Sequence, residues 1–402
     1  MGLQELKAQL KETLGPSKTS KKQYKEEVQI EEVYHRADWQ DIEVDFLNSY
    51  YSQDGNNASV TGGIGTEQLT DFTQKIILSI PTSPKLKLKA DAAYDYYSSA
   101  STDNIDNIRS SDSSSDVRAQ LGFGLEYKNS KNWTSDARIG LSSEYDYTSF
   151  HAGGGLSFRS DDGNRQIGLS GQAFYDTWIP FYPSELRGEV AVPTNKRQSY
   201  NLSLGFQQVL NQKLQASIML ETTYMKGLLS TPFHRVFFQD TDRPDIERLP
   251  DQRWKIPIGT RLNYHLHEKI VFRSYYRFYY DSWGMSGHTA SIELPIKINR
   301  FLAIYPHYRF HTQTAIQHFQ PYQEHLSTSE FYTSDFDLSA LNSQTYGIGL
   351  LYSPPNGIAK VNFPLMENRA LRLEAIDLKA SIFSRSTGLS AFIISVGAKV
   401  KF

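Results

Sequence analysis

The last residues of the chain alternate between apolar and polar side chains. One side of this segment is apolar and aromatic and holds Phe392, Ile394, Val396, Ala398, Val400 and Phe402. The other side is small or cationic from Ser395 onward, with Gly397, Lys399 and Lys401, although Ala391 and Ile393 also fall on it. Successive side chains of a strand point to opposite faces, so the pattern predicts an extended strand with one apolar and one polar face. This is typical of a transmembrane β-strand with lipid on one side and a polar lumen on the other.

Comparable alternation recurs after residue 40 and predicts about sixteen strands, within a range of about 14 to 16. They are expected near 41–53, 70–81, 85–98, 115–127, 134–147, 152–160, 165–178, 198–210, 213–226, 253–265, 269–282, 287–298, 301–313, 343–353, 371–384 and 389–402. Charged residues repeatedly fall on one face of a strand, as Lys87, Lys89 and Asp91 do in the third strand. A charge on the lipid face near the midplane would cost about 2–4 kcal/mol. The predicted fold class is therefore all-β, an antiparallel, up-and-down transmembrane β-barrel.

The lengths of the connections support a barrel. Links after even-numbered strands are mostly short, such as 211–212, 267–268 and 299–300. Links after odd-numbered strands include the long ones, near 54–69, 99–114, 179–197, 227–252 and 314–342. Outer-membrane barrels have short periplasmic turns and longer external loops, so an even strand count places both termini on the periplasmic side. The segment 354–370 is an exception, because it is a long link on the predicted short side.

Aromatic residues gather at both ends of the apolar face. The expected outer group is Tyr50, Tyr96, Tyr147, Tyr224 and Tyr280, and the inner group includes Tyr264 and Tyr352. Tyr has an apolar ring and a polar tip, so it prefers the interface between membrane and water. A soluble β-sandwich also alternates, but its strands tend to be shorter and its loops show no consistent bias of length.

Composition excludes several classes of protein. The chain has 402 residues, a formal net charge of −2, an aromatic share of 13% and no Cys. No apolar run reaches the roughly 18 residues that a transmembrane helix needs. The near-neutral charge gives no case for nucleic acid as a partner. The absence of Cys from the sequence removes thiol catalysis and Cys metal sites.

The first forty residues differ from the rest. Residues 3–14 have Leu3, Leu6, Leu10 and Leu14 at the spacing of a short amphipathic helix, and 15–40 are rich in Lys and Glu. We expect 1–40 to be a charged periplasmic arm or plug and 41–402 to be the barrel. No secretory signal pattern is present in 1–40, and since a barrel must be exported, Met1 is expected to begin a mature or recombinant form.

Five segments carry a resemblance to a known family. They read YYSQDGNN followed by TGGIGTE within 50–67, DYYSSASTD at 95–103, GLLSTPFHRV at 227–236, ERLPD at 247–251 and YTSDFDL at 332–338. Together they resemble the bacterial family catalogued as domain of unknown function 3570, over about 41–402. The resemblance implies an outer-membrane protein of a Gram-negative bacterium and no assigned activity. The resemblance also implies that proteins of this family occur together with small lipoproteins, thioredoxin-like proteins and flavin-attaching enzymes. That association suggests a role in the redox chemistry of the cell envelope. The terminal Phe402 also resembles the signal that the outer-membrane barrel assembly machinery reads.

Charged residues on the inner face are the first candidates for a functional site. They are Arg261, Arg273, Arg277 and Arg309 on strands ten, eleven and thirteen, with Glu293 and Lys297 on the strand between. One interpretation is a wall that attracts anions, as charged linings do in pores. The other is a structural ladder in which Glu293 pairs with Arg across strands. The two interpretations are compatible.

Metal and enzyme chemistry have less support. Oxygen ligands on the Gly-rich 54–67 segment, namely Asp54, Asn56 and Glu67, are candidates for Ca²⁺, but their spacing does not match an EF-hand loop. Asn and Gly are ordinary residues of turns. No motif pairs a His with a nucleophile, and no Rossmann, P-loop or His-Glu-x-x-His pattern occurs. We therefore expect no enzymatic activity, no cofactor and no metal.

These observations favour an outer-membrane barrel that acts as a passive pore or conduit with a charged lumen. The alternative is a closed barrel that serves as a scaffold or partner subunit of an envelope complex, with a redox link as one form of it. The expected partners are the lipid bilayer, the barrel assembly machinery, and a periplasmic protein or lipoprotein. The long 227–252 loop, with Phe233, Phe237 and Phe238, is expected to fold into the barrel or meet a partner.

Overall fold

The strands form where the sequence alternates. The computed structural model describes residues 41–99, 115–362 and 370–402. Its long strands are β1 (Glu43–Asp54), β2 (Leu69–Pro81), β3 (Leu86–Ser99), β4 (Ser115–Lys128), β5 (Trp133–Ser143), β6 (Tyr147–Arg159), β7 (Arg165–Trp178), β8 (Lys196–Asn211), β9 (Leu214–Gly227), β12 (Gln252–His267), β13 (Ile270–Asp281), β14 (Ser286–Glu293), β16 (Leu302–Gln313), β17 (Leu341–Tyr352), β19 (Ala370–Arg385) and β20 (Ser390–Lys401). No helix among the described residues has both the length and the apolar character to cross a membrane.

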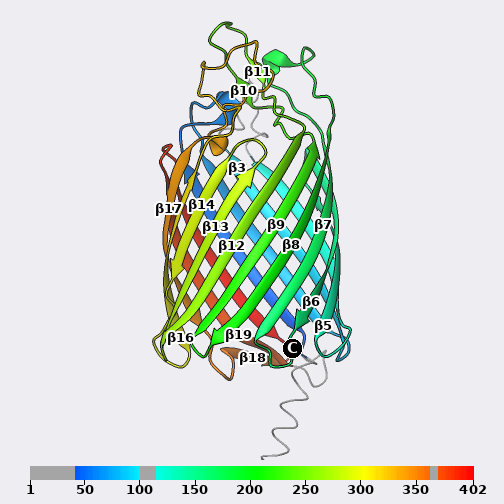
Figure 1. The fold of residues 1–402 in the computed structure, drawn as a ribbon, viewed down its shortest axis with the longest axis vertical. Coiled ribbons are helices and arrows are strands. Elements are labelled where there is room, and N and C mark those ends of the chain that lie inside the picture. Colours follow the sequence, from blue (N-terminus) through cyan, green and yellow to red (C-terminus); the bar gives the residue numbers. More distant parts are fainter. Residues whose placement is uncertain (1–40, 100–114, 363–369) are drawn as a thin grey trace, which may run out of the picture.

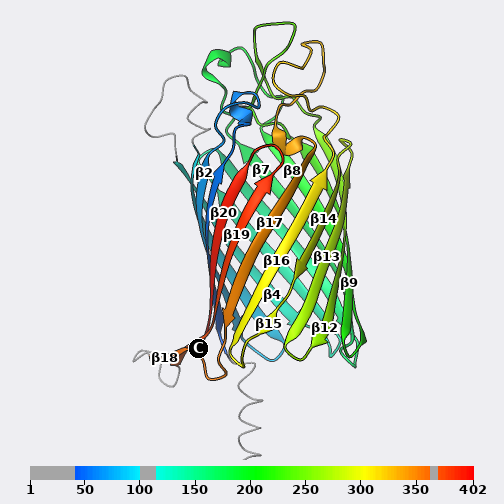
Figure 2. The ribbon, with the colours of Figure 1, turned by 90° about the vertical axis from the view of Figure 1, so that its left-hand side faces the viewer.

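The sheet closes on itself as a barrel (Figures 1 and 2). Each long strand pairs antiparallel with the next, and β20 pairs with β1 to complete the circle. Two short strands complete the sheet, β15 (Ile296–Lys297) and β18 (Ala359–Asn362). β15 continues the line of β14 because both pair with β13 and β16, and β18 pairs only with the start of β19. Sixteen strands therefore make the wall, and the predicted fold class is confirmed.

The outer face of the wall is apolar. Exposed residues on it include Phe72, Ile76, Leu121, Phe123, Ile139, Leu141, Leu202, Leu204, Ile292, Ile348, Leu378 and Ile382. In a soluble protein this much contiguous apolar surface would be unfavourable, so it marks contact with lipid. The polar residues between them take the opposite face of each strand and line the inside.

The two rims of the barrel differ. Segments 55–68, 179–195, 228–251 and 314–340 all leave the same rim, which we call the long-loop rim (upper end in Figure 1). They contain η1 (Ser59–Thr61), η3 (Ser184–Leu186), η4 (Phe336–Leu338) and the small hairpin β10 (Arg235–Val236) and β11 (Asp245–Ile246). The opposite, short-turn rim holds both ends of the barrel, where the Phe402 N–H donates to the Ile42 carbonyl at 3.0 Å. The predicted arm at 1–40 and the loop 100–114 lie outside the described residues.

One predicted pair of strands needs correction. The fifth strand ends at Ser143 instead of continuing to 147, and the sixth begins at Tyr147 instead of 152. A tight turn separates them, in which the Glu144 N–H donates to the Tyr147 carbonyl at 2.7 Å. Residues 144–146 contain no Gly or Pro, and the turn residues Ser143 and Asp146 on either side of Glu144 and Tyr145 were overlooked because the alternation continues through them. Tyr147 nevertheless lies at the long-loop rim.

Buried apolar clusters lie at the long-loop rim. In the described residues, one cluster contains Leu249, Trp283, Met285 and Ile316, and the other contains Val236, Phe238 and Tyr332. Most of these residues belong to the long segments and not to the wall strands. The long loops therefore pack against one another in a layer above the barrel, whereas the apolar residues of 227–252 predicted a loop that folds into the barrel or meets a partner.

Candidate functional site

The predicted inner-face charges lie on neighbouring strands. On β13 the outward-facing Tyr276 and Tyr280 are exposed, so Arg273 and Arg277 point to the inner face. Arg273 stands opposite Glu293 in the register of β13 and β14, and its Nη1 lies 2.7 Å from the Glu293 Oε1. This contact is the cross-strand pair expected of a structural ladder.

The other inner-face arginines contact aromatic rings. The Cζ of Arg261 lies 5.8 Å from the centre of the Tyr275 ring, and Arg277 lies at the same distance from Tyr279. Cation–π contact of this kind holds a guanidinium near a wall without neutralising it. Arg261 and Arg273 line a cavity of about 520 Å³, and Arg309 lines another of about 550 Å³ with Lys379 and His307. Lys297 is in β15 near the short-turn rim and lines neither cavity.

The predicted girdle residues lie near the two rims. Exposed members on the outer face are Tyr50, Tyr96 and Tyr280 toward the long-loop rim, and Tyr264 and Tyr352 toward the short-turn rim. Tyr147 and Tyr224 instead pack on tryptophans, with ring centres 4.7 Å from Trp178 and 4.6 Å from Trp254. Their part in positioning the barrel in a bilayer stays a prediction.

Arg235 joins three of the long loops. Its side chain is 5% exposed, and it donates to the Val60 carbonyl at 2.8 Å and to both carboxylate oxygens of Glu185 at 2.5 and 3.1 Å. The guanidinium hydrogen bond and charge hold the pKa of Glu185 below its ordinary value, although burial opposes this. The fourth loop joins through backbone hydrogen bonds exchanged between Arg248 and Tyr332, at 2.7 and 3.0 Å. We call these four interlocked segments the loop cap.

A cavity of about 430 Å³ lies where the loop cap meets the top of the barrel wall. We call it the vestibule. Its lining comes from β1, β2, β19, the turn after β19 and three loops, and it comprises Tyr51, Gln53, Ala58, Ser59, Val60, Glu67, Gln68, Leu69, Phe233, His234, Asp335, Asp337, Phe383, Arg385 and Leu389. The lining therefore combines buried charges with apolar side chains in one partly enclosed space.

Acidic groups crowd one side of the vestibule. Arg385, 6% exposed in its side chain, forms ion pairs with Glu67, at 3.4 Å, and with Asp337. Burial raises the pKa of Glu67 to about 7, and the nearby Asp337 and Asp335 add to the shift while Arg385 opposes it. Glu67 thus faces Arg385, whereas Asp54 accepts a hydrogen bond from Gln68 at 3.2 Å. A calcium site at Asp54, Asn56 and Glu67 stays a prediction.

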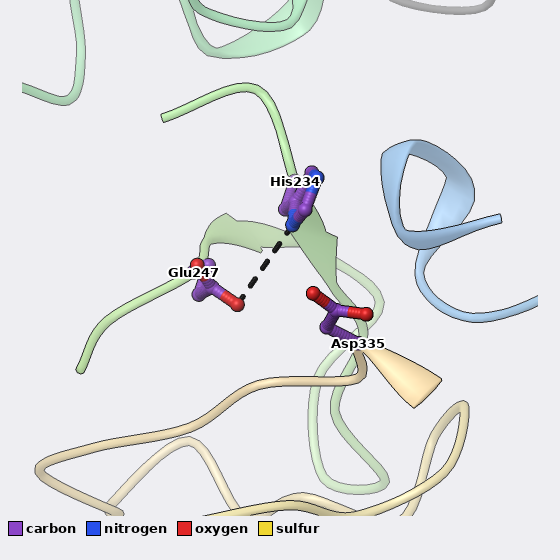
Figure 3. A group of neighbouring side chains, drawn as sticks. All are labelled: His234, Glu247 and Asp335. Carbon is purple, nitrogen blue, oxygen red and sulfur yellow. Dashed lines mark ion pairs between the residues drawn. The ribbon is translucent and has the colours of Figure 1, made fainter. Parts of the chain in front are cut away.

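A second group of side chains does converge. His234, Glu247 and Asp335 offer ligand atoms that all lie within 4.8 Å of one another (Figure 3). The His234 Nδ1 lies 3.8 Å from the Glu247 Oε1, and the Glu247 side chain is 3% exposed. Burial alone would lower the pKa of His234, but the negative charges of Glu247, Asp335 and Asp337 raise it above its ordinary value. This group, which we call the His–Glu–Asp cluster, is a candidate cation site.

The pattern of the sequence does not reveal this cluster. His234 and Asp335 are 101 positions apart by their residue numbers (335 − 234), and no spacing rule connects them. One signal was present, because His234, Glu247 and Asp335 each fall within a segment that carries the family resemblance, and so does Glu67. Segments recognised separately along the chain therefore meet at the vestibule.

Comparison with known proteins gives a family and a set of similar folds. The profile of the family described as "Protein of unknown function (DUF3570)" matches residues 36–358. Among curated proteins none matches the chain. Solved structures that are similar include OccK1 (OpdK) of Pseudomonas aeruginosa, at 9% identity and TM-score 0.42, and a bacterial polysaccharide outer membrane secretin, at 10% and 0.48. A BenF-like porin from Pseudomonas fluorescens Pf-5 is similar at 9% and 0.43, and each of the three comparisons covers 90% of this chain and 98% of the other.

The architecture agrees with the predicted location. A closed antiparallel barrel with an even number of strands, an apolar outer band and rims of unequal loop length is the structure of outer-membrane barrels. The predicted location in the outer membrane of a Gram-negative bacterium is therefore confirmed.

Proposed function

We propose that this chain, which belongs to the family described as protein of unknown function (DUF3570), is a passive pore or conduit with a charged lumen. The observation that carries the proposal is the closed wall of sixteen strands, whose inner face is polar and bordered by cavities. Barrels of this size have room for an aqueous channel. The long-loop rim faces the outside of the cell in this proposal, and the short-turn rim faces the periplasm.

The charge of the inner wall supports a preference for anions. On β3, β4 and β5 several inner charges are paired, as in Arg138 with Asp91 and Lys89 with Glu126. On β12, β13 and β16 no carboxylate of the described residues forms an ion pair with Arg261, Arg277 or Arg309. An uncompensated positive wall attracts anions, because charged rings set the selectivity of pores.

The test is single-channel conductance of the purified full chain in a planar bilayer. We expect steady steps with anion preference, and Arg261→Gln, Arg277→Gln and Arg309→Gln together should move the reversal potential toward cation preference. Arg243→Gln is the matched control, because Arg243 is 63% exposed on the loop cap and away from the inner wall. A shorter chain that begins at residue 41 tests whether 1–40 blocks the lumen. The absence of steps in both forms would rule out a pore.

A second function has a specific observation behind it. The loop cap is a built structure with buried apolar clusters and the buried Arg235, and such a surface suits a scaffold that binds a partner. In this alternative the barrel is closed and is a subunit of an envelope complex. The loop cap binds a partner at the cell surface, a periplasmic protein or lipoprotein docks at the short-turn rim, and the assembly machinery is needed only for insertion. Arg235→Ala separates the two functions, because loosening the loop cap should raise conductance in a gated pore and leave a closed barrel silent.

A further inference from the structure

We propose that the His–Glu–Asp cluster binds a divalent transition-metal ion of the zinc class, which ties the 228–251 loop to the 314–340 loop. His234 and Glu247 come from the first loop and Asp335 from the second (Figure 3). This site is independent of the proposed pore function, because its test measures metal binding and not conductance.

The distances fit a metal after small side-chain rotations. All three ligand atoms lie within 4.8 Å of one another, and the His234 Nδ1 is 3.8 Å from the Glu247 Oε1. A tetrahedral zinc ion with bonds of about 2.0–2.2 Å holds its ligands roughly 3.3–3.5 Å apart. One imidazole nitrogen with two carboxylates suits zinc and its neighbours, whereas calcium takes oxygen ligands only.

Two buried polar atoms at this place have no hydrogen-bond partner among the described residues. They are the Nδ1 of His234 and the Oγ of Ser334, the residue beside Asp335. Buried polar groups are nearly always satisfied, so each exception calls for an explanation. A metal ion at the cluster would use the Nδ1 lone pair.

The carboxylate ligands are held by a second layer of contacts. Glu247 accepts from the Thr231 N–H at 2.7 Å and from the Thr333 hydroxyl at 2.5 Å. The same hydroxyl accepts from the Asp335 N–H at 3.0 Å, so Thr333, which is fully buried, orients both acidic residues. The Oδ1 of Asp335 accepts from the Asp337 N–H at 2.9 Å, which leaves its second oxygen for a metal. Outer contacts of this kind are typical of metal sites.

The charge balance of the vestibule favours a bound cation. Four carboxylates, those of Glu67, Glu247, Asp335 and Asp337, influence one another or His234 electrostatically, and Arg385 is the permanently charged cation that pairs with two of them. Partly buried carboxylates in excess repel one another, and a divalent ion would relieve this repulsion. Three protein ligands also leave a fourth position open, and His234 and Asp335 both line the vestibule, so a water or solute can occupy it.

The experiment is calorimetric titration of the chelator-treated, tag-free full chain with zinc chloride. We expect one site per chain whose affinity falls by more than about tenfold in Asp335→Asn, since even outer contacts of metal sites contribute 10–100-fold. Asp335→Asn spares the contact between His234 and Glu247, so it separates a metal site from a simple ion pair of these two residues. Asp240→Asn is the control, because Asp240 joins the same two loops through Ser327 and lies outside the cluster.

A second measurement needs no variant. Zinc should slow hydrogen exchange in 228–251 and 314–340 of the unaltered chain while leaving the turns of the short-turn rim unchanged. The inference is wrong if zinc does not bind the unaltered chain. It is also wrong if zinc binds the Asp335→Asn variant as tightly as the unaltered chain. Binding without any protection of the two loops also overturns it, because the ion would then be elsewhere.

Discussion

At the scale of single residues, burial decides what a charged pair contributes. Asp281 is 1% exposed and Arg253 is 9% exposed, and the Arg253 Nε donates to the Asp281 Oδ2 at 3.0 Å. Asp281 also accepts from the Tyr279 hydroxyl and from the Trp283 and Met285 N–H groups, at 2.8 to 3.1 Å. Arg273 and Glu293 form a similar contact one strand further on, but the Arg273 side chain is 53% exposed.

The two pairs should therefore differ strongly in stability. Asp281→Ala leaves Arg253 buried without its partner and should lower the free energy of unfolding by about 3–5 kcal/mol. Glu293→Ala, the matched control, breaks an exposed pair and should cost about 1 kcal/mol or less. Urea unfolding in detergent micelles measures both. If both variants lose the same free energy of unfolding, Asp281 does not stabilise the long-loop rim in the way that its contacts indicate.

The carboxyl group of Glu67 gives the loop cap a dependence on pH. Burial raises its pKa from the ordinary 4.5 to about 7, Asp337 and Asp335 add to this, and Arg385 and the Asn57 N–H oppose it. A raised folded-state pKa means that the folded loop binds the proton more tightly than the unfolded chain does. Its stability is therefore greatest below pH 4.5 and falls as the pH rises toward about 7.

Hydrogen exchange of 55–68 tests this dependence on metal-free protein, after correction for the intrinsic rate. Protection should be lower at about pH 8 than at about pH 5.5, and Glu67→Gln should abolish the difference. Asp54→Asn, at the exposed base of the same loop, should retain it. An unchanged difference in Glu67→Gln would assign the effect to another group.

At the scale of elements, glycines on the inner face give rings a place to lie flat. Gly349 of β17 stands opposite Tyr305 of β16, and a Cβ added to it would meet the ring at 2.0 Å. Gly347 stands opposite His307 in the same way, and Gly140 stands opposite His151. Rings held against the backbone in this manner cover the glycine and leave the lumen clear.

A side chain at one of these glycines should disturb the wall. Gly349→Val would push the Tyr305 ring away from the wall and break the hydrogen bond of its hydroxyl to Asp377, at a cost of about 1–3 kcal/mol. Gly168→Val in β7 is the control, because a Cβ there meets nothing within 4 Å. The control should change unfolding in urea by no more than about 0.5 kcal/mol. Equal effects would show that Gly349 is needed for some reason other than the ring.

The wall strands could be predicted because a strand in lipid must keep apolar side chains on its outer face and polar side chains on its inner face. Boundaries fell within a few residues except at 144–146, where a short turn has no Gly or Pro and the alternation continues through it. The break between β14 and β15 was also missed, although Pro295 lacks the N–H that the ladder needs and could have marked it. β18 is a short strand within the long link 354–370, and a four-residue segment gives too little alternation to recognise.

At the scale of the whole molecule, the loop cap could not be predicted in detail. The buried Arg235 reaches Val60 and Glu185, which are 175 and 50 positions away, and such contacts leave no periodic mark in a sequence. The inner-face charges were predictable because side chains alternate between the two faces of a strand, so position in the strand decides which side chains point into the barrel. The His–Glu–Asp cluster instead depends on how two irregular segments pack. Local pattern therefore predicted the wall, and tertiary contacts determine the vestibule.

The seam between β1 and β20 has a consequence for how the molecule is made. It joins residues as far apart as Glu43 and Lys401, which are 358 positions apart (401 − 43), so the circle closes only when the last strand arrives. Until then β1 keeps an edge of unpaired N–H and C=O groups, which is a template for wrong pairing with another chain. Contacts of such long sequence separation also form slowly, because the entropy of loop closure is lost before they are gained. The nascent sheet therefore needs its open edge shielded until the last strand pairs with β1.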